Sequence, residues 1–255
     1  MNVFITGASS GIGAALAQLY AARGDHLALV ARRGRVLHEL AASLPREHSV
    51  YSADVTDTAS MRTLAEREIA AHGLPDVVIA SAGVSIGTLT ERPEDFEFFK
   101  KVIDTNVTAL FATFSPFAGK MRERGSGRLV GIASVAGIRG LPGSGAYSAS
   151  KAAVIGYCES LRVELRNSGV KVVTIVPGYI RTPMTAKNPY GMPFLMEAGA
   201  FAARAVAAID AGASYRVIPW QMGLVARLLH ILPNWLYDPA FANIKRKPRA
   251  DKSAP

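Results

Sequence analysis

The feature of this chain that most constrains its fold is a regular alternation of short apolar segments with helical patterns. Segments typical of β-strands occur near residues 2–6, 26–31, 49–52, 76–80, 128–133, 171–176 and 215–218, and helical patterns fill most of the intervals between them. Strands that alternate with helices pair in parallel, because each helix carries the chain back across the sheet before the next strand. The sequence therefore predicts an α/β protein with a doubly wound parallel sheet of about seven strands and helices on both faces.

Size and composition predict one domain with a short extension. With 255 residues, 49% of them hydrophobic, the chain can bury one sizeable core, and no segment approaches the ~20 apolar residues that a membrane-spanning helix needs. We expect the domain in residues 1–218, an apolar helical extension in 219–244 and a basic, disordered tail in 245–255. A first strand at residue 2 without a leader, and a single cysteine, favour the cytoplasm.

A glycine-rich turn follows the first predicted strand. Thr6-Gly7-Ala8-Ser9-Ser10-Gly11-Ile12-Gly13 comes directly after Val3-Phe4-Ile5 and opens a helical pattern. Such a turn lets the backbone approach a pyrophosphate at a helix N-terminus, where the helix dipole favours an anion. It predicts dinucleotide binding in a single-domain Rossmann fold. The expected contacts in the turn are Gly7, Ser9, Ser10, Gly11, Ile12 and Gly13.

The end of the second predicted strand indicates which dinucleotide is bound. An acidic residue there selects NAD, whereas an arginine accommodates the 2′-phosphate of NADP. This chain has Arg32 and Arg33 and no acidic residue, so we expect NADP(H) in preference to NAD(H), with Arg32 as the bidentate partner and Arg33 as a second charge. The residues expected beside the rest of the cofactor follow the third and fourth strands: Asp54 and Val55 at the adenine, then the small residues Ala80, Ser81, Ala82 and Gly83.

A tyrosine and a lysine four residues apart, Tyr147 and Lys151, share one face of a predicted helix. A nearby ammonium lowers the pKa of a tyrosine hydroxyl from its usual ~10, so that the hydroxyl can exchange a proton near neutral pH. Ser134 ends the fifth predicted strand, at the carboxyl edge of the sheet where ligands bind in such folds. The three residues therefore predict proton transfer at that edge.

These motifs, taken in order from Val3 to about Ile218, resemble the short-chain dehydrogenase/reductase family in its single-domain form of about 250 residues. The resemblance implies that Tyr147 is the general acid and base, that Ser134 bonds the substrate oxygen, that Lys151 holds the nicotinamide ribose, and that Asn106 organises a water. No metal is implied. It also implies cofactor contacts after the sixth strand, from Pro177, Gly178, Ile180 and Thr182.

One motif departs from the family pattern. Ala80-Ser81-Ala82-Gly83 stands where the family usually has two asparagines before Ala-Gly. The two amide side chains are missing, which puts the usual bracing of the central strand in doubt.

Two segments bear on the substrate. The irregular stretch at 177–199 follows the sixth strand, and its tyrosines, methionines and Phe194 predict a lid over an apolar substrate. The apolar extension after Ile218 predicts a helix that covers the substrate pocket or contacts another subunit. The alternative is peripheral contact of 219–255 with a membrane surface, since the last eleven residues carry five basic residues and one acidic residue.

The expected function is NADP(H)-dependent interconversion of a carbonyl and an alcohol on a small apolar substrate. Two alternatives are a non-catalytic NADP-binding sensor or scaffold and a nicotinamide-dependent sugar-nucleotide epimerase or dehydratase, which the short carboxyl-terminal region disfavours. No aromatic interleaving in the basic tail supports nucleic-acid binding. The resemblance further implies a homodimer or homotetramer assembled through the helices near 99–124 and 147–167.

Overall fold

The fold is built on one seven-stranded parallel sheet. The computed structural model describes residues 1–249, and its main sheet has the order β3-β2-β1-β4-β5-β6-β9 with every neighbouring pair parallel. The order reverses direction between β1 and β4, which confirms the predicted doubly wound sheet. The strands are β1 (Asn2–Thr6), β2 (His26–Ala31), β3 (Ser49–Ser52), β4 (Val77–Ala80), β5 (Gly127–Ile132), β6 (Val170–Pro177) and β9 (Tyr215–Ile218).

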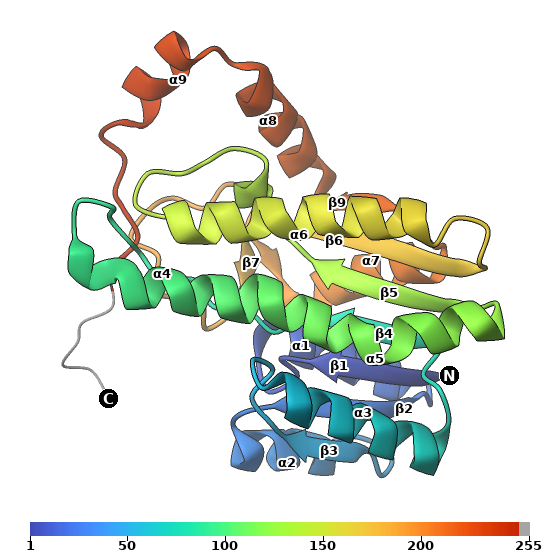
Figure 1. The fold of residues 1–255 in the computed structure, drawn as a ribbon. Coiled ribbons are helices and arrows are strands. Elements are labelled where there is room, and N and C mark those ends of the chain that lie inside the picture. Colours follow the sequence, from blue (N-terminus) through green and yellow to red (C-terminus); the bar gives the residue numbers. More distant parts are fainter. Residues whose placement is uncertain (250–255) are drawn as a thin grey trace.

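Helices cover both faces of this sheet (Figure 1). One face carries α1 (Gly11–Ala22), α2 (Gly34–Ala42) and α7 (Ala198–Asp210), and the other carries α3 (Thr58–His72), α5 (Ala109–Arg124) and α6 (Gly145–Glu164). The sequence builds both cores from one strand, because alternate side chains of β1 point to opposite faces. Val3 and Ile5 pack beneath α1, whereas Phe4 packs against Phe117 of α5, with ring centroids 4.9 Å apart.

The expected helix near 99–124 is interrupted. It consists of α4 (Phe96–Ile103), a π-helical turn (Asp104–Thr108) and then α5. A π-helical turn inserts a wider loop into a helix and is common at functional sites, and this turn carries Asn106. The sequence pattern is helical on both sides of the turn, so periodicity alone does not reveal it.

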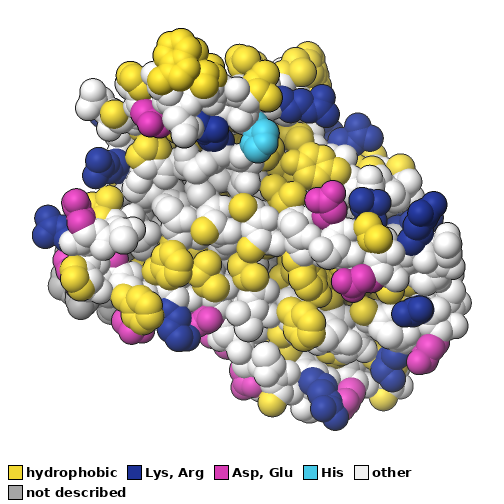
Figure 2. Space-filling model, turned by 45° about the horizontal axis from the view of Figure 1, so that its top comes forward, with side chains coloured by type: hydrophobic (Ala, Val, Ile, Leu, Met, Phe, Trp, Pro, Cys, Tyr) yellow, Lys and Arg dark blue, Asp and Glu magenta, His cyan; other side chains and the backbone are white. Residues whose placement is uncertain are grey.

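The extension after β9 forms two helices, α8 (Trp220–Ile231) and α9 (Asn234–Phe241). They hold the loop that follows β5: the Tyr237 hydroxyl donates to the carbonyl of Gly140 at 2.6 Å, and Arg139 donates to Asn234 at 2.8 Å. Figure 2 looks onto this side of the molecule and has hydrophobic side chains gathered over these helices beside several basic ones. The large hydrophobic residues exposed there are Trp220, Leu224, Leu228, Ile231, Trp235 and Leu236. Within residues 1–249, no helix is long and apolar enough to cross a membrane.

The segment after α9, residues 242–249, returns to the carboxyl edge of the sheet (Figure 1). Lys247 and Arg249 make side-chain contacts with the loop that follows β4 and with the short turn before α4. Residues 245–249 of the predicted tail therefore lie against these loops, where Ser85 holds Lys247 and buried Asp95 holds Arg249. Its remaining part, 250–255, lies outside the described residues.

Candidate functional site

The candidate site lies where β1, β4 and β5 end at the carboxyl edge of the sheet. The parallel register aligns Thr6 of β1 with Ala80 of β4, and Ala80 with Gly131 of β5. The glycine turn, the small residues after β4 and Ser134 after β5 therefore meet, as the sequence predicts for a sheet with this topology.

The glycine turn brings β1 close to the segment after β4. Gly7 has a φ of +69°, and a Cβ at this position would lie 2.7 Å from Cα of Ala82. A Cβ at Gly13 would lie 2.3 Å from the carbonyl oxygen of Gly7. Both glycines are therefore required by close packing of the turn, which leaves the N-terminus of α1 facing the cavity.

Arg33 lies directly over this turn. Its guanidinium donates to the hydroxyls of Ser9 at 3.0 Å and Ser10 at 2.6 Å. Ser10 is the N-cap residue of α1, yet its side chain makes no capping hydrogen bond. The N–H groups of the first helical turn are thus left available beside a cation, a combination that favours a phosphate.

A cavity of about 520 Å³ opens beside the turn. A Rossmann dinucleotide requires a hollow bordered by small residues and by cations, and this lining fits that requirement. Met184 of the predicted lid lines the cavity. The predicted cofactor-binding residues that line it are Gly7, Ser9, Ser10, Arg32, Arg33, Val55, Ser81, Ala82 and Gly83.

Other nominated residues lie outside this lining. Ile12 packs against the core beneath α1, and the Ile180 side chain belongs to the same core. Ala80 borders a smaller hollow behind the cavity, and Asp54 borders a neighbouring surface hollow. The Asp54 carboxylate already accepts from the backbone and hydroxyl of Thr56, at 2.9 and 2.8 Å.

Arg32 takes a different position from Arg33. Its guanidinium approaches the Asp54 carboxylate at 3.7 Å, and the Arg32 side chain is 53% exposed. The sequence predicts Arg32 as the main partner of the 2′-phosphate. Of the two arginines, however, it is Arg33 that hydrogen-bonds with the glycine turn. Sequence position cannot separate two consecutive arginines, because the residue that turns inward depends on how the chain leaves β2.

Ser134, Tyr147 and Lys151 converge, as the sequence predicts. Ser134 follows β5, and its hydroxyl lies close to that of Tyr147 near the start of α6. Lys151 is buried, its Nζ donates to the carbonyl oxygen of Ile132 at 2.8 Å, and that Nζ lies 5.8 Å from the Tyr147 ring centroid. Gly83 closes the group, because a Cβ there would lie 3.6 Å from the Lys151 Nζ.

The electrostatics of this group differ from the expectation. Burial raises the pKa of Tyr147 above its ordinary value, and the neighbouring Ser134 hydroxyl opposes that rise. Burial lowers the pKa of Lys151 to about 8. The ammonium is therefore not the dominant influence on the tyrosine here, since desolvation penalises both charged forms. At neutral pH the Tyr147 hydroxyl retains its proton, which suits a general acid.

Asn106 joins the loop after β4 to α6. Its Oδ1 accepts from the backbone N–H of Val84 at 2.8 Å, and its Nδ2 donates to the Val84 carbonyl at 3.0 Å and to Ser150 Oγ at 2.9 Å. Ser150 in turn donates to the carbonyl of Tyr147 at 2.7 Å. Sequence reasoning missed Ser150, although its place within Tyr-Ser-Ala-Ser-Lys offered a signal.

The Thr6 side chain braces the segment after β4. Its hydroxyl accepts from the backbone N–H groups of Ser81 at 3.2 Å and Ala82 at 3.4 Å. It also donates to the carbonyl of Ile79 at 3.4 Å. Thr6 is fully buried, so its single side chain links β1 to β4.

The lid lies against the site. β7 (Ile180–Arg181) pairs with β8 (Met196–Glu197), and these strands close the loop between them. The side chain of Thr182 faces the glycine turn, 3.3 Å from where a Gly11 Cβ would lie. Burial raises the pKa of Tyr190 to about 12, with a further contribution from neighbouring Tyr179 and Tyr147. Tyr190 therefore lies near enough to Tyr147 for their charges to interact.

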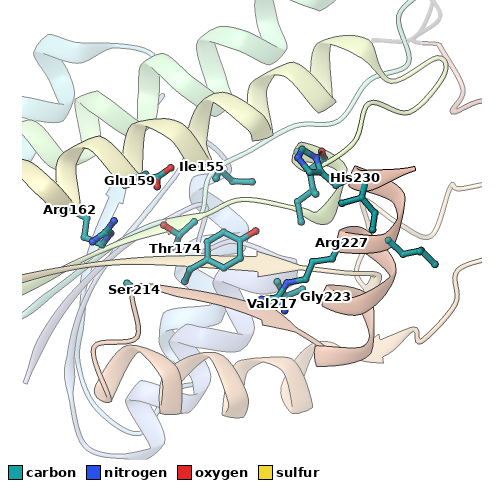
Figure 3. Close-up of a pocket in the computed structure, with 14 residues that line it drawn as sticks. Ile155, Glu159, Arg162, Thr174, Ser214, Val217, Gly223, Arg227 and His230 are labelled. Atoms are coloured by element: carbon teal, nitrogen blue, oxygen red, sulfur yellow. Dashed lines mark hydrogen bonds between the residues drawn. The ribbon is translucent and has the colours of Figure 1, made fainter. Parts of the chain in front are cut away.

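A larger hollow lies elsewhere. Figure 3 shows this cavity of about 920 Å³, with Glu159 and Arg162 of α6 on one side and Arg227 of α8 on the other. None of the nominated catalytic residues lines it, and size alone therefore does not identify the reaction centre.

Comparisons with known proteins agree with this geometry. A family model for the short chain dehydrogenase matches residues 1–191. An uncharacterized oxidoreductase of Myxococcus xanthus is 40% identical, covering 96% of this chain and 97% of its own. A 2-dehydro-3-deoxy-L-rhamnonate dehydrogenase (NAD(+)) of Sphingomonas is 37% identical over 72% of this chain and 74% of its own. A short-chain dehydrogenase from Sphingobium yanoikuyae, solved in complex with NADPH, has a TM-score of 0.78 at 27% identity, covering 98% of this chain and 99% of its own.

The fold and the site define an oxidoreductase that acts between a carbonyl and an alcohol. The chain belongs to the short-chain dehydrogenase/reductase family. A nicotinamide cofactor is expected, and the similar proteins are described with NADPH or with NAD(+).

Proposed function

We propose that the protein is an NADP(H)-dependent oxidoreductase that interconverts a carbonyl and an alcohol on a substrate with an apolar body. The observation that carries the proposal is the convergence of Ser134, Tyr147 and Lys151 beside Gly83, which lines the same cavity as Arg33. A proton donor and an anion site at one cavity match a reduction that uses NADPH, the dinucleotide with a 2′-phosphate.

Each residue has a distinct role. Tyr147 protonates the substrate oxygen during reduction, and Ser134 holds that oxygen by a hydrogen bond. Lys151 binds the ribose next to the nicotinamide and adds positive charge near Tyr147. Asn106 fixes the start of α6 through Ser150, so that the tyrosine stays aligned. A bound nicotinamide cofactor supplies or accepts the hydride.

The preference for a phosphorylated cofactor rests on Arg33. A guanidinium hydrogen-bonded to two serine hydroxyls at a helix N-terminus offers several donors to one phosphate. Arg32 adds a second positive charge at the rim. No acidic residue follows β2 to hold the ribose hydroxyls of NAD(H) instead.

The substrate's apolar body is inferred from the lid. Tyr179 and Tyr190 lie with ring centroids 6.4 Å apart, and Met184 reaches the cofactor cavity. Side chains of this kind exclude water from the reacting atoms and favour apolar groups.

The test is turnover by a Tyr147→Phe variant. We expect wild-type enzyme to oxidise NADPH in the presence of an aldehyde or ketone panel, and the variant to lose at least ~100-fold in kcat, the size of a general-acid contribution. Tyr157→Phe is the matched control, because Tyr157 lies on the same helix and points to Phe111 instead. NADPH binding should survive in both variants. Retained turnover in Tyr147→Phe would remove the proposed acid, and binding without turnover in wild type would favour a sensor.

Assembly through α4, α5 and α6 is part of the same proposal. Phe96, Phe99, Phe111 and Val163 are large apolar residues that these helices expose. Burial of such a row against a second copy is the usual explanation for exposed aromatic residues along helices. Phe111→Asp should convert a dimer or tetramer to a smaller species in light scattering. A wild-type monomer would contradict this proposal, and liposome co-sedimentation would then test α8 and α9 as a membrane contact.

A further inference from the structure

The terminal segment, residues 242–249, lies beside the candidate site. Arg249 forms a parallel β-bridge with Gly87, and the Gly87 N–H donates to the carbonyl of Pro248 at 3.2 Å. Gly87 belongs to the loop after β4, which contacts the loop after β5 through Thr88 and Gly143 at 3.1 Å. The terminal segment therefore meets both loops that border Tyr147.

Two glycines make room for this segment. A Cβ at Gly87 would lie 2.4 Å from the carbonyl oxygen of Lys247, and a Cβ at Gly143 would lie 2.9 Å from Cβ of Arg246. Any side chain at Gly87 would displace the segment, because the atom it meets belongs to the backbone. By contrast, nothing lies within 4 Å of a Cβ at Gly140, in the same loop as Gly143.

Arg249 anchors the segment through a buried carboxylate. Its Nε and NH2 donate to both oxygens of Asp95, at distances between 2.7 and 3.2 Å. The Asp95 side chain is 4% exposed, and it also accepts from the backbone N–H of Leu89 at 2.8 Å. Glu94 accepts a further bond from Arg249 at 3.1 Å. Removal of the arginine would leave a buried negative charge unpaired, so the pair fixes the position of the segment.

The segment places Lys247 beside the catalytic tyrosine. The Lys247 Nζ donates to Ser85 Oγ at 2.7 Å and lies 5.9 Å from the Tyr147 ring centroid. Burial lowers the pKa of Lys247 to about 8, so the ammonium still predominates at neutral pH. Within residues 1–249, no carboxylate lies within ion-pair distance of this ammonium.

The Lys247 ammonium is partly buried, and its hydrogen-bond partner is a neutral hydroxyl. No opposite charge among the described residues therefore compensates the ammonium. Taking a cation out of water is costly unless an opposite charge compensates it. The Lys247 ammonium is thus available to bind an anionic group of a substrate that approaches Tyr147. A single lysine offers one positive charge, which matches a carboxylate, whereas a phosphate carries nearly two negative charges and usually receives several donors.

We propose that Lys247 is a specificity-determining residue that binds a carboxylate on the substrate. The substrate class is then an oxo acid, or the matching hydroxy acid, whose apolar body separates the carboxylate from the reacting carbonyl. The inference rests on the proposed carbonyl-reducing function and adds the charge of the substrate to it. Arg249, Asp95 and Gly87 act through Lys247, because they hold the segment that carries it.

The experiment compares each of two oxo acids with its own methyl ester, using NADPH. The probes are 4-formylbenzoate and methyl 4-formylbenzoate, then 4-oxopentanoate and its methyl ester. The measured quantity is the ratio of kcat/KM for the acid to kcat/KM for the ester. In wild type this ratio should exceed one for at least one pair, and Lys247→Gln should lower it by ~10- to 100-fold, the loss typical of one charged hydrogen bond. Lys247→Arg keeps the charge and should retain most of the preference.

A second pair of variants tests the segment rather than the lysine itself. Gly87→Val should displace the segment and lower the ratio as Lys247→Gln does, whereas Gly140→Ala should keep the wild-type ratio. Thermal unfolding and NADPH titration establish that each variant is folded. A ratio that is the same in wild type and Lys247→Gln for both pairs overturns the inference while leaving the proposed function intact. Absence of turnover with every carbonyl compound in wild type contradicts the proposed function, and the inference fails with it.

Discussion

Cofactor selection by Arg33 gives the sharpest quantitative prediction. Arg33 donates to Ser9 and Ser10 at the N-terminus of α1, whereas Arg32 approaches Asp54 at 3.7 Å and is more than half exposed. If the 2′-phosphate of NADPH binds at the serines, then Arg33→Gln removes a charged donor from that phosphate. NADH lacks the phosphate, so its affinity should change little.

The expected magnitude follows from the geometry. A hydrogen bond to a charged group contributes about 1.5–3 kcal/mol, and 1.4 kcal/mol corresponds to a tenfold change in Kd. Because Arg33 is exposed to solvent, which screens its charge, we expect the lower part of that range. Arg33→Gln should therefore weaken NADPH binding by ~10- to 30-fold. Arg32→Gln should weaken it by less than ~3-fold, as expected for a solvated ion pair.

The assay is fluorescence titration with NADPH and with NADH at one fixed ionic strength, since salt alters exposed charge interactions. Arg35→Gln serves as the control, because Arg35 is an exposed residue of α2 that pairs with Glu39 at 3.5 Å. Equal weakening of NADPH and NADH in Arg33→Gln would refute phosphate recognition by this residue. A larger loss in Arg32→Gln would return the role to Arg32.

Three further predictions concern stability. Asn106→Ala leaves the N–H and carbonyl of Val84 without their partners and should cost about 1–3 kcal/mol per unpaired group in urea unfolding. Phe117→Ala empties a fully buried site against Phe4 and should cost about 3–5 kcal/mol in the same assay, with an unchanged m value. Burial lowers the pKa of His48 in the folded state, so acidification through its unfolded pKa of ~6.5 favours unfolding. The urea concentration at the unfolding midpoint should therefore decrease as the pH is lowered from 8 to 5, and it should decrease less in His48→Gln.

Sequence reasoning predicted the sheet and the chemical residues because both depend on local patterns. Each strand of the main sheet was identified to within one residue at either end, since apolar runs bounded by glycine or polar residues mark buried parallel strands. Ser134, Tyr147 and Lys151 lie at fixed distances from a strand end or along one helix, and their convergence follows from those positions. The π-helical turn at Asn106 has no such pattern, because its sequence is compatible with an ordinary helix.

The position of the terminal segment could not be predicted from local sequence patterns. Lys245, Arg246, Lys247 and Arg249 have the composition of a solvated tail, and composition says nothing about a partner 154 positions earlier in the chain. The partner is Asp95, whose burial depends on the segment that covers it, so neither residue reveals the pair alone. The role of Gly87 could not be predicted either, because glycines are common in loops. It becomes visible only when another backbone segment is found packed against this residue. Charge compensation of a buried acid by a distant arginine is a tertiary property, and it brings Lys247 to a site that the rest of the sequence had already defined.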